Sequence, residues 1–158
     1  MSSEPPFFPR AALRLGFLAL APLAISALIT LSSYPATARL GAIAFALYAA
    51  ILLSFLGGVR CGFELMRSPR DPNPLRLLFS ALPALAGWVL TVFVVYFTIA
   101  LGAAAAFSGL FALQYMWDQT SARDAGAPVW YPPLRQVLTG GAMIACLMIP
   151  LATALQHI

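Results

Sequence analysis

The stretch Ser54-Phe-Leu-Gly-Gly-Val-Arg-Cys-Gly-Phe-Glu64 joins a glycine-rich apolar sequence to two opposite charges. Arg60 and Glu64 are separated by one helical turn, so they lie on the same side of a helix. The apolar sequence before them is long enough to cross a membrane, and ionisable groups at membrane depth are costly. We therefore expect this pair to mark either a polar contact between helices or the membrane boundary.

The composition indicates an integral membrane protein. Of the 158 residues, 61% are hydrophobic and 9% are charged. Soluble domains carry about 25% charged residues, so this chain has too few charges to cover a surface that faces water. All nine basic residues are arginine, and the net charge is +4. We assign this charge to contacts with membrane lipids and expect no nucleic-acid partner, because no motif combines basic and aromatic residues.

The apolar pattern predicts an all-α, polytopic membrane helical bundle of about five transmembrane helices in one domain, residues 1–158. The expected helices are residues 12–31, 41–66, 76–96, 100–117 and 134–155. A single helix from Leu77 to Trp117 would be about 60 Å long, twice the hydrocarbon thickness, so the chain must turn back between Tyr96 and Gly102. The first segment could be a signal peptide, since Ala36-Thr-Ala38 resembles a cleavage site. Its length favours a retained helix.

The arginines predict the orientation of the bundle. With five spans, seven arginines fall on the side of the N-terminal tail, and Arg39 falls on the other side. Basic residues are enriched on the cytoplasmic side. We therefore expect a bacterial inner-membrane protein with a cytoplasmic N-terminus and a periplasmic C-terminus. The seven residues are Arg10, Arg14, Arg67, Arg70, Arg76, Arg123 and Arg135.

A helical wheel of the second segment separates large residues from small and polar ones. We expect the large face to contact lipid and the small face to pack against other helices, since small residues let helix backbones approach closely. The large residues are Leu52, Phe55, Leu56, Val59, Phe63 and Met66, and the opposite face holds Ser54, Gly57, Gly58, Arg60, Cys61, Gly62 and Glu64. In the third segment, Gly87 belongs to a similar stripe with Ser80, Ala84 and Thr91.

A polar cluster is predicted at the arginine-rich side, where Arg60, Glu64, Asp118 and Arg135 all lie at helix ends. Asp118 and Arg135 bracket one loop, so their helices could bring them together, and buried charges require partners. For Arg60 and Glu64 two interpretations stay open. They form a buried pair, or they reach the headgroup level along the membrane surface.

No catalytic constellation is present in the sequence. Ser-His-Asp sets, suitably spaced carboxylate pairs, phosphate loops and HExxH motifs are all missing. The only histidine is His157, and the two cysteines form no CxxC motif. We therefore predict a protein that is not an enzyme and that has no metal site and no cofactor.

Two motifs carry a family resemblance. The segment from Ser54 to Gly62 resembles the "FLGGVRWG" segment of the transmembrane-protein-69-like family, a bacterial inner-membrane domain of unknown function. Pro128-Val-Trp-Tyr-Pro-Pro-Leu-Arg-Gln-Val-Leu-Thr139 resembles its "P-x-WY-xx-LR-xx-LT" segment, and Pro83 and Gly87-Trp88 match its middle span. Cys61 departs from the pattern, which usually has tryptophan there.

The resemblance implies about five helices in a bacterial or mitochondrial inner membrane, and it implies no activity. It directs attention to a set of motif residues that we expect to meet in space, with Arg60 or Arg135 near Trp130. The set is Gly57, Gly58, Arg60, Trp130, Tyr131, Leu134, Arg135 and Thr139.

Two functions are compatible with the sequence. The first is an accessory or assembly subunit of a larger respiratory or photosynthetic membrane complex, with other integral membrane subunits as partners. The alternative is a binder or carrier of a lipid, a quinone or a small solute. Its pocket would hold Arg60, Glu64 and Arg135, with Trp130 and Tyr131 as a lid.

Overall fold

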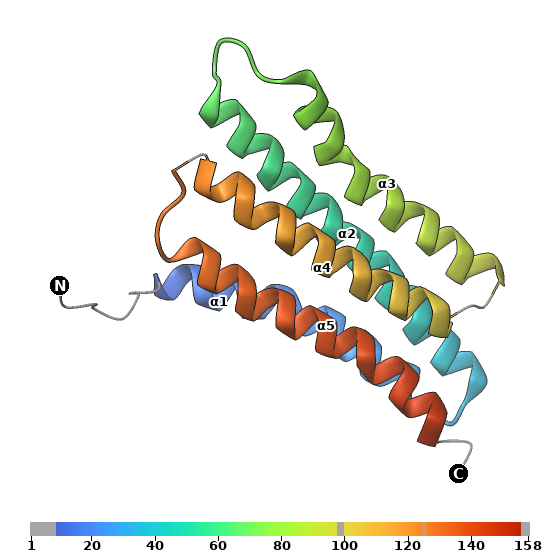
Figure 1. Cartoon of the computed structure of the whole chain (residues 1–158). Coiled ribbons are helices and arrows are strands. Elements are labelled where there is room, and N and C mark those ends of the chain that lie inside the picture. The colour runs from blue at the N-terminus through green and yellow to red at the C-terminus, as the bar shows by residue number, and fades with distance from the viewer. Residues whose placement is uncertain (1–8, 98–99, 125, 156–158) are drawn as a thin grey trace.

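The computed structural model describes the backbone of residues 9–97, 100–124 and 126–155, and these residues form a bundle of five helices. The helices are α1 (Arg10–Thr30), α2 (Pro35–Arg67), α3 (Pro74–Phe97), α4 (Ala100–Asp124) and α5 (Tyr131–Leu155). They lie side by side with alternating direction, and α1 begins at the end of the bundle opposite to the end of α5 (Figure 1). The α2–α3 and α4–α5 connections lie at the same end as the start of α1. We call this end of the bundle, where α1 starts and these two connections lie, the arginine-rich end.

The central helix is α2, which packs against α1, α3 and α4, while α5 packs against α1 and α4. A T-shaped contact joins Phe45 of α2 to Phe107 of α4, with ring centroids 6.1 Å apart. Leu23 of α1 and Cys146 of α5 complete this core and are fully buried. Every described helix except α3 therefore brings a large or polarisable side chain to the centre, and α3 adds Val94.

The helix ends differ from the predicted ones in two places. Proline is favourable in the first turn of a helix, so α2 begins at Pro35, before the predicted residue 41. The predicted loop from Asp118 is wrong, because α4 continues to Asp124. Asp118 and Ala122 are each 1% exposed, so the buried face of α4 extends beyond its apolar sequence and keeps this segment helical.

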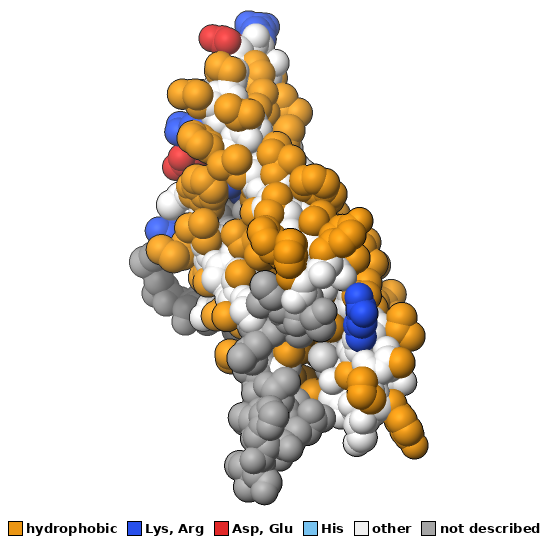
Figure 2. All heavy atoms as spheres, turned by 90° about the vertical axis from the view of Figure 1, so that its right-hand side faces the viewer, with side chains coloured by type: hydrophobic (Ala, Val, Ile, Leu, Met, Phe, Trp, Pro, Cys, Tyr) orange, Lys and Arg blue, Asp and Glu red, His pale blue; other side chains and the backbone are white. Residues whose placement is uncertain are grey.

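Among the described residues, four helices are long and apolar enough to cross a membrane: Arg10–Thr30, Pro35–Arg67, Pro74–Phe97 and Tyr131–Ile149. The fifth, α4, is less apolar, since it carries polar side chains such as Gln114 and Asp118, both buried inside the bundle. Hydrophobic side chains cover most of the described part of the face in Figure 2, with few charges among them. The fold is thus a polytopic membrane helical bundle, as predicted.

The predicted division of α2 into a lipid face and a packing face is only partly correct. Gly57, Arg60 and Glu64 are buried, whereas Ser54 and Gly58 are exposed. The large Leu56 is also buried. Because α2 contacts three neighbouring helices, its buried stripe is broad and includes large residues, and no single row of small residues defines it.

Candidate functional site

Charged side chains from four helices gather at the arginine-rich end. Arg60, Glu64 and Arg67 come from α2, Arg76 comes from α3, Asp118 and Asp124 come from α4, and Arg135 comes from α5. These seven residues comprise four arginines and three carboxylates. Each carboxylate forms an ion pair with an arginine other than Arg60.

The deepest ion pair joins Asp118 to Arg135. Arg135 donates from Nε and Nη2 to Asp118 Oδ2, at 3.0 and 2.7 Å. Gln114 lies one turn before Asp118, and its Nε2 donates to the other carboxylate oxygen at 3.1 Å. The Asp118 side chain is 1% exposed, so the pair confirms the predicted contact across the α4–α5 connection and joins these two helices.

Glu64 pairs with α3 and not with Arg60. Its Oε1 accepts a hydrogen bond from the backbone N–H of Asn73 at 3.0 Å, and its Oε2 lies 3.5 Å from Arg76 Nη1. Glu64 therefore fixes the connection between α2 and α3 to the end of α2. Neither of the two interpretations of an Arg60–Glu64 pair describes this arrangement.

A second, more exposed ion pair lies beside it. Arg67 Nη1 is 3.0 Å from Asp124 Oδ2, and Arg76 Nη1 is 3.8 Å from the same oxygen. Asp124 is 48% exposed, so solvent and salt weaken these contacts. These two contacts form the solvent-exposed side of the cluster.

Among the four arginines of this cluster, Arg60 is the one that forms no ion pair with the three carboxylates. It is 8% exposed, and its guanidinium carbon lies 4.1 Å from the centroid of the Trp117 ring, a cation–π contact. Within the described part of the chain, its Nε and Nη1 have no hydrogen-bond partner. A buried donor without a partner costs about 1–3 kcal/mol, so an added acceptor would be favourable here.

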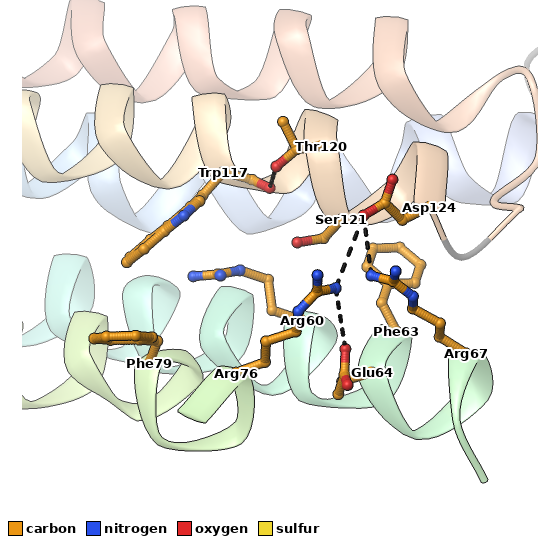
Figure 3. A pocket seen from close by; sticks show the side chains of 10 residues that line it. All are labelled: Arg60, Phe63, Glu64, Arg67, Arg76, Phe79, Trp117, Thr120, Ser121 and Asp124. Atoms are coloured by element: carbon orange, nitrogen blue, oxygen red, sulfur yellow. Dashed lines mark hydrogen bonds and ion pairs between the residues drawn. The ribbon is translucent and has the colours of Figure 1, made fainter. Parts of the chain in front are cut away.

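Arg60 lines a cavity of about 280 Å³, which we call the arginine pocket. Figure 3 shows Arg60 extending beneath Trp117, away from the ion pairs that Arg67 and Arg76 make with the acidic residues. The hydroxyl-bearing residues Thr120 and Ser121 of α4 form the opposite wall. The complete lining is Arg60, Phe63, Glu64, Arg67, Arg76, Phe79, Trp117, Thr120, Ser121 and Asp124.

The second predicted motif lies at a different cavity. Trp130, Tyr131, Arg135 and Thr139 line an apolar cavity of about 310 Å³ between α1, α2 and α5. Phe55, Leu56 and Val59 of the first motif line this same apolar cavity. Phe63, which directly follows the first motif, forms a T-shaped contact with Tyr131, with ring centroids 5.2 Å apart.

The expectation that Trp130 and Tyr131 cover the arginine pocket is wrong, because both line the apolar cavity and neither lines the arginine pocket. Arg135 is near Trp130, since both line the apolar cavity. The aromatic partner of Arg60 is instead Trp117.

The predicted packing residues separate into two groups. At Gly57, a Cβ atom would collide with the carbonyl oxygen of Ser80, and at Gly87 it would lie 3.0 Å from the Cα of Ala50. Both glycines thus permit the close approach of α2 and α3. Gly58 and Gly62 have open space at the same position, and the hydroxyl of the exposed Ser54 donates to the backbone oxygen of Ala50 in its own helix.

Several residues of the site were missed in the sequence. Arg76 was considered only as one of the arginines that orient the bundle, and Asp124 was not singled out, yet both line the arginine pocket. Gln114 could have been found, because it precedes Asp118 by four residues and therefore shares its helix face. The position of Trp117 over Arg60 depends on how α4 is rotated against α2, which no local pattern encodes.

The fold and the site define a class: a multi-pass helical membrane protein with a charged pocket at one end of the bundle. Within that class, the chain belongs to the family described as "Protein of unknown function (DUF3429)", whose model matches residues 8–152. The chain is also similar to Transmembrane protein 69 of Xenopus tropicalis, with 37% identity over 136 aligned residues. The alignment covers 83% of this chain and 50% of that relative. The chain thus spans about half the length of this relative. No solved structure matches.

Proposed function

We propose that this protein is not an enzyme and binds the anionic group of an amphiphilic ligand in the arginine pocket. One observation carries the proposal: Arg60 is a buried cation whose neighbouring carboxylates are all held by other arginines. An anion with several oxygens would accept hydrogen bonds from Nε and Nη1. Arginine suits this role because its planar guanidinium matches carboxylate and phosphate groups.

The surrounding residues support binding of an anion and not of a cation. Arg67 and Arg76 line the same pocket as Arg60, and both are partly exposed. Arg67 and Arg76 are paired with Asp124 and Glu64, which line the same pocket, so these four charges balance and the positive charge of Arg60 remains in excess. Ser121 provides a hydroxyl on the opposite wall, whereas the Thr120 hydroxyl donates to the backbone oxygen of Trp117.

The location of the pocket supports an amphiphilic ligand. We place the protein in a bacterial inner membrane with the arginine-rich end in the cytoplasm, following the enrichment of arginine at that side. The pocket would then lie at the level of the lipid headgroups, where anionic lipids gather.

Fluorescence of Trp117 provides the test, because the Arg60 guanidinium lies against its ring. A variant with Trp88→Phe and Trp130→Phe retains Trp117 as its only tryptophan. We expect titration of the purified protein with glycerol phosphate or with phosphatidylglycerol in a nonionic detergent to change the emission. Arg60→Gln should abolish the change.

Arg70→Gln is the matched control, since it removes the same charge from an exposed residue that does not line the pocket. The proposal fails if the Arg60→Gln and Arg70→Gln proteins respond alike to the probes. Arg60→Lys checks the chemistry. It keeps the charge but loses the planar group, and it should bind more weakly than the parent protein.

A second candidate function is that of an accessory or assembly subunit of a larger respiratory or photosynthetic membrane complex. The observation that favours it is the open surface of α2 at Gly58 and Gly62, where a Cβ atom would meet nothing. Glycine inside a helix costs about 1 kcal/mol relative to alanine, and a closely packed helix of another subunit would explain its presence.

The test for this function is native electrophoresis of mildly solubilised native membranes. A high-mass complex that Gly58→Leu dissociates would support it, while migration as a free chain for both proteins would contradict it.

A further inference from the structure

A second feature of the surface lies directly beside the arginine pocket. An apolar groove of about 650 Å³ runs between α3 and α4. Its walls are Leu82, Leu85 and Val89 of α3 and Gly109 and Leu113 of α4, together with their neighbours. Leu85 is 58% exposed and Leu113 is 52% exposed, so the groove opens outward from the bundle.

The groove lies between α3 and α4, and these two helices also line the arginine pocket together with α2. On α3, Arg76 and Phe79 line the pocket, and Leu82 follows in the groove at the next step of three residues. On α4, Trp117 lines the pocket and Leu113 lines the groove, four residues apart. Residues at such spacings share one face of a helix, so the groove follows the pocket along α3 and α4. We call the two together the track.

An aromatic pair stands where the charged part of the track meets the apolar part. The rings of Phe79 and Trp117 have centroids 5.9 Å apart, and they face each other from α3 and α4 (Figure 3). Arg60 lies against the same Trp117 ring. Aromatic side chains commonly occupy the boundary between headgroups and hydrocarbon, which is the level that this junction would have in a membrane.

The length of the track agrees with one membrane leaflet. Phe79 and Val89 are separated by ten residues, or about 15 Å along a helix. The hydrocarbon core of a membrane is about 30 Å thick, so one leaflet accounts for about the same length.

We propose that the arginine pocket and the α3–α4 groove together hold an anionic phospholipid, with its phosphate on Arg60 and one acyl chain in the groove. This inference rests on the proposed function and names the ligand of that same site. A soluble anion would need the pocket alone, and a neutral lipid would need the groove alone. The phospholipid is favoured because its charge complements Arg60 and its chain matches the apolar walls beyond Phe79 and Trp117.

The experiment compares two probes with one shared headgroup chemistry. Phosphatidylglycerol has the acyl chains and glycerol phosphate does not, and both carry the phosphate. Each is titrated against the protein that retains only Trp117, with Gly109→Leu as the groove variant. Gly109 is exposed and has open space around an added Cβ. A leucine at this position therefore fills the groove without displacing neighbouring side chains or backbone.

We expect Gly109→Leu to weaken phosphatidylglycerol binding by about tenfold, which equals about 1.4 kcal/mol, and to leave glycerol phosphate unaffected. Gly140→Leu is the matched control, because Gly140 also has open space around an added Cβ and lines neither the groove nor the arginine pocket. It should change neither titration. Thermal unfolding of each variant verifies that the bundle is intact.

Each outcome decides between the two proposals. If both probes bind equally well and Gly109→Leu changes neither, the acyl-chain inference is overturned while the anion site stands. If neither probe binds, or if Arg60→Gln leaves their binding unchanged, the proposed function itself fails and the inference fails with it.

Discussion

Replacing Asp118 by asparagine should destabilise the bundle strongly. The carboxylate is 1% exposed and is the ion-pair partner of Arg135, which is 9% exposed. It also attracts Arg60 electrostatically. Removing one partner of a buried ion pair costs about 3–5 kcal/mol, because the other charge is left buried without compensation. Asp118→Asn leaves Arg135 without its ion-pair partner and also removes the attraction of the carboxylate on Arg60, so we expect a loss within or above that range.

The matched control is Asp124→Asn, which makes the same chemical change on the same helix. The Asp124 carboxylate is 48% exposed and pairs with Arg67 and Arg76, both partly exposed. Exposed ion pairs contribute about 0–1 kcal/mol. The free energy of unfolding of the three proteins, measured in mixed micelles with increasing denaturing detergent, provides the comparison.

A double variant separates charge from packing. Asp118→Leu combined with Arg135→Met replaces the pair by apolar side chains, a change that is often neutral in other proteins. The double variant should recover only part of the lost stability, because it also lacks the Asp118 carboxylate that attracts Arg60. Equal losses for Asp118→Asn and Asp124→Asn would refute the conclusion that the buried pair joins α4 to α5.

Three further predictions concern packing and the pocket. Gly57→Ala should lower the free energy of unfolding by about 1–3 kcal/mol, since its Cβ would meet the Ser80 carbonyl. Gly58→Ala should instead raise the free energy of unfolding by about 1 kcal/mol. Detergent denaturation of both proteins measures the difference. Phe45→Ala should cost about 3–5 kcal/mol, because this side chain is 2% exposed in the core, and a midpoint equal to that of the parent would contradict the packing described. Trp117→Leu should weaken anion binding several-fold by removing about 0.5–2 kcal/mol of cation–π stabilisation, as measured by retention of phosphatidylglycerol after gel filtration.

Much of the fold was predictable because it depends on local composition. Apolar runs and arginine-rich ends indicate five helices and their connections, and the helix bounds agree to within a few residues at most ends. The end of α4 was missed because its last turns are polar by composition. They stay helical through burial of Asp118 and Ala122, which is a tertiary effect.

The site was only partly predictable, for a similar reason. The contact of Asp118 with Arg135 followed from their positions on either side of one connection, and burial of Arg60 followed from the helical wheel. The ion-pair partner of Glu64 could not be predicted in this way. Arg60 lies one helical turn away and is the evident candidate, whereas Arg76 belongs to α3 and comes next to Glu64 only when the bundle folds.

The outward position of Gly58 could not be read from small-residue spacing alone. Glycines that pack against helices of the same chain and glycines that leave an open surface give the same pattern. The rotation of α2 against three neighbours separates the two, and this rotation places Gly57 against Ser80 and leaves Gly58 open.

The most direct measurement of the central claim is native mass spectrometry of the protein extracted gently from bacterial membranes, with Arg60→Gln and Arg70→Gln for comparison. The account predicts that the parent and the Arg70→Gln protein retain an anionic phospholipid and that the Arg60→Gln protein releases it. Equal retention by all three proteins, or no anionic lipid on any of them, would contradict the assignment of Arg60 as the anion-binding residue.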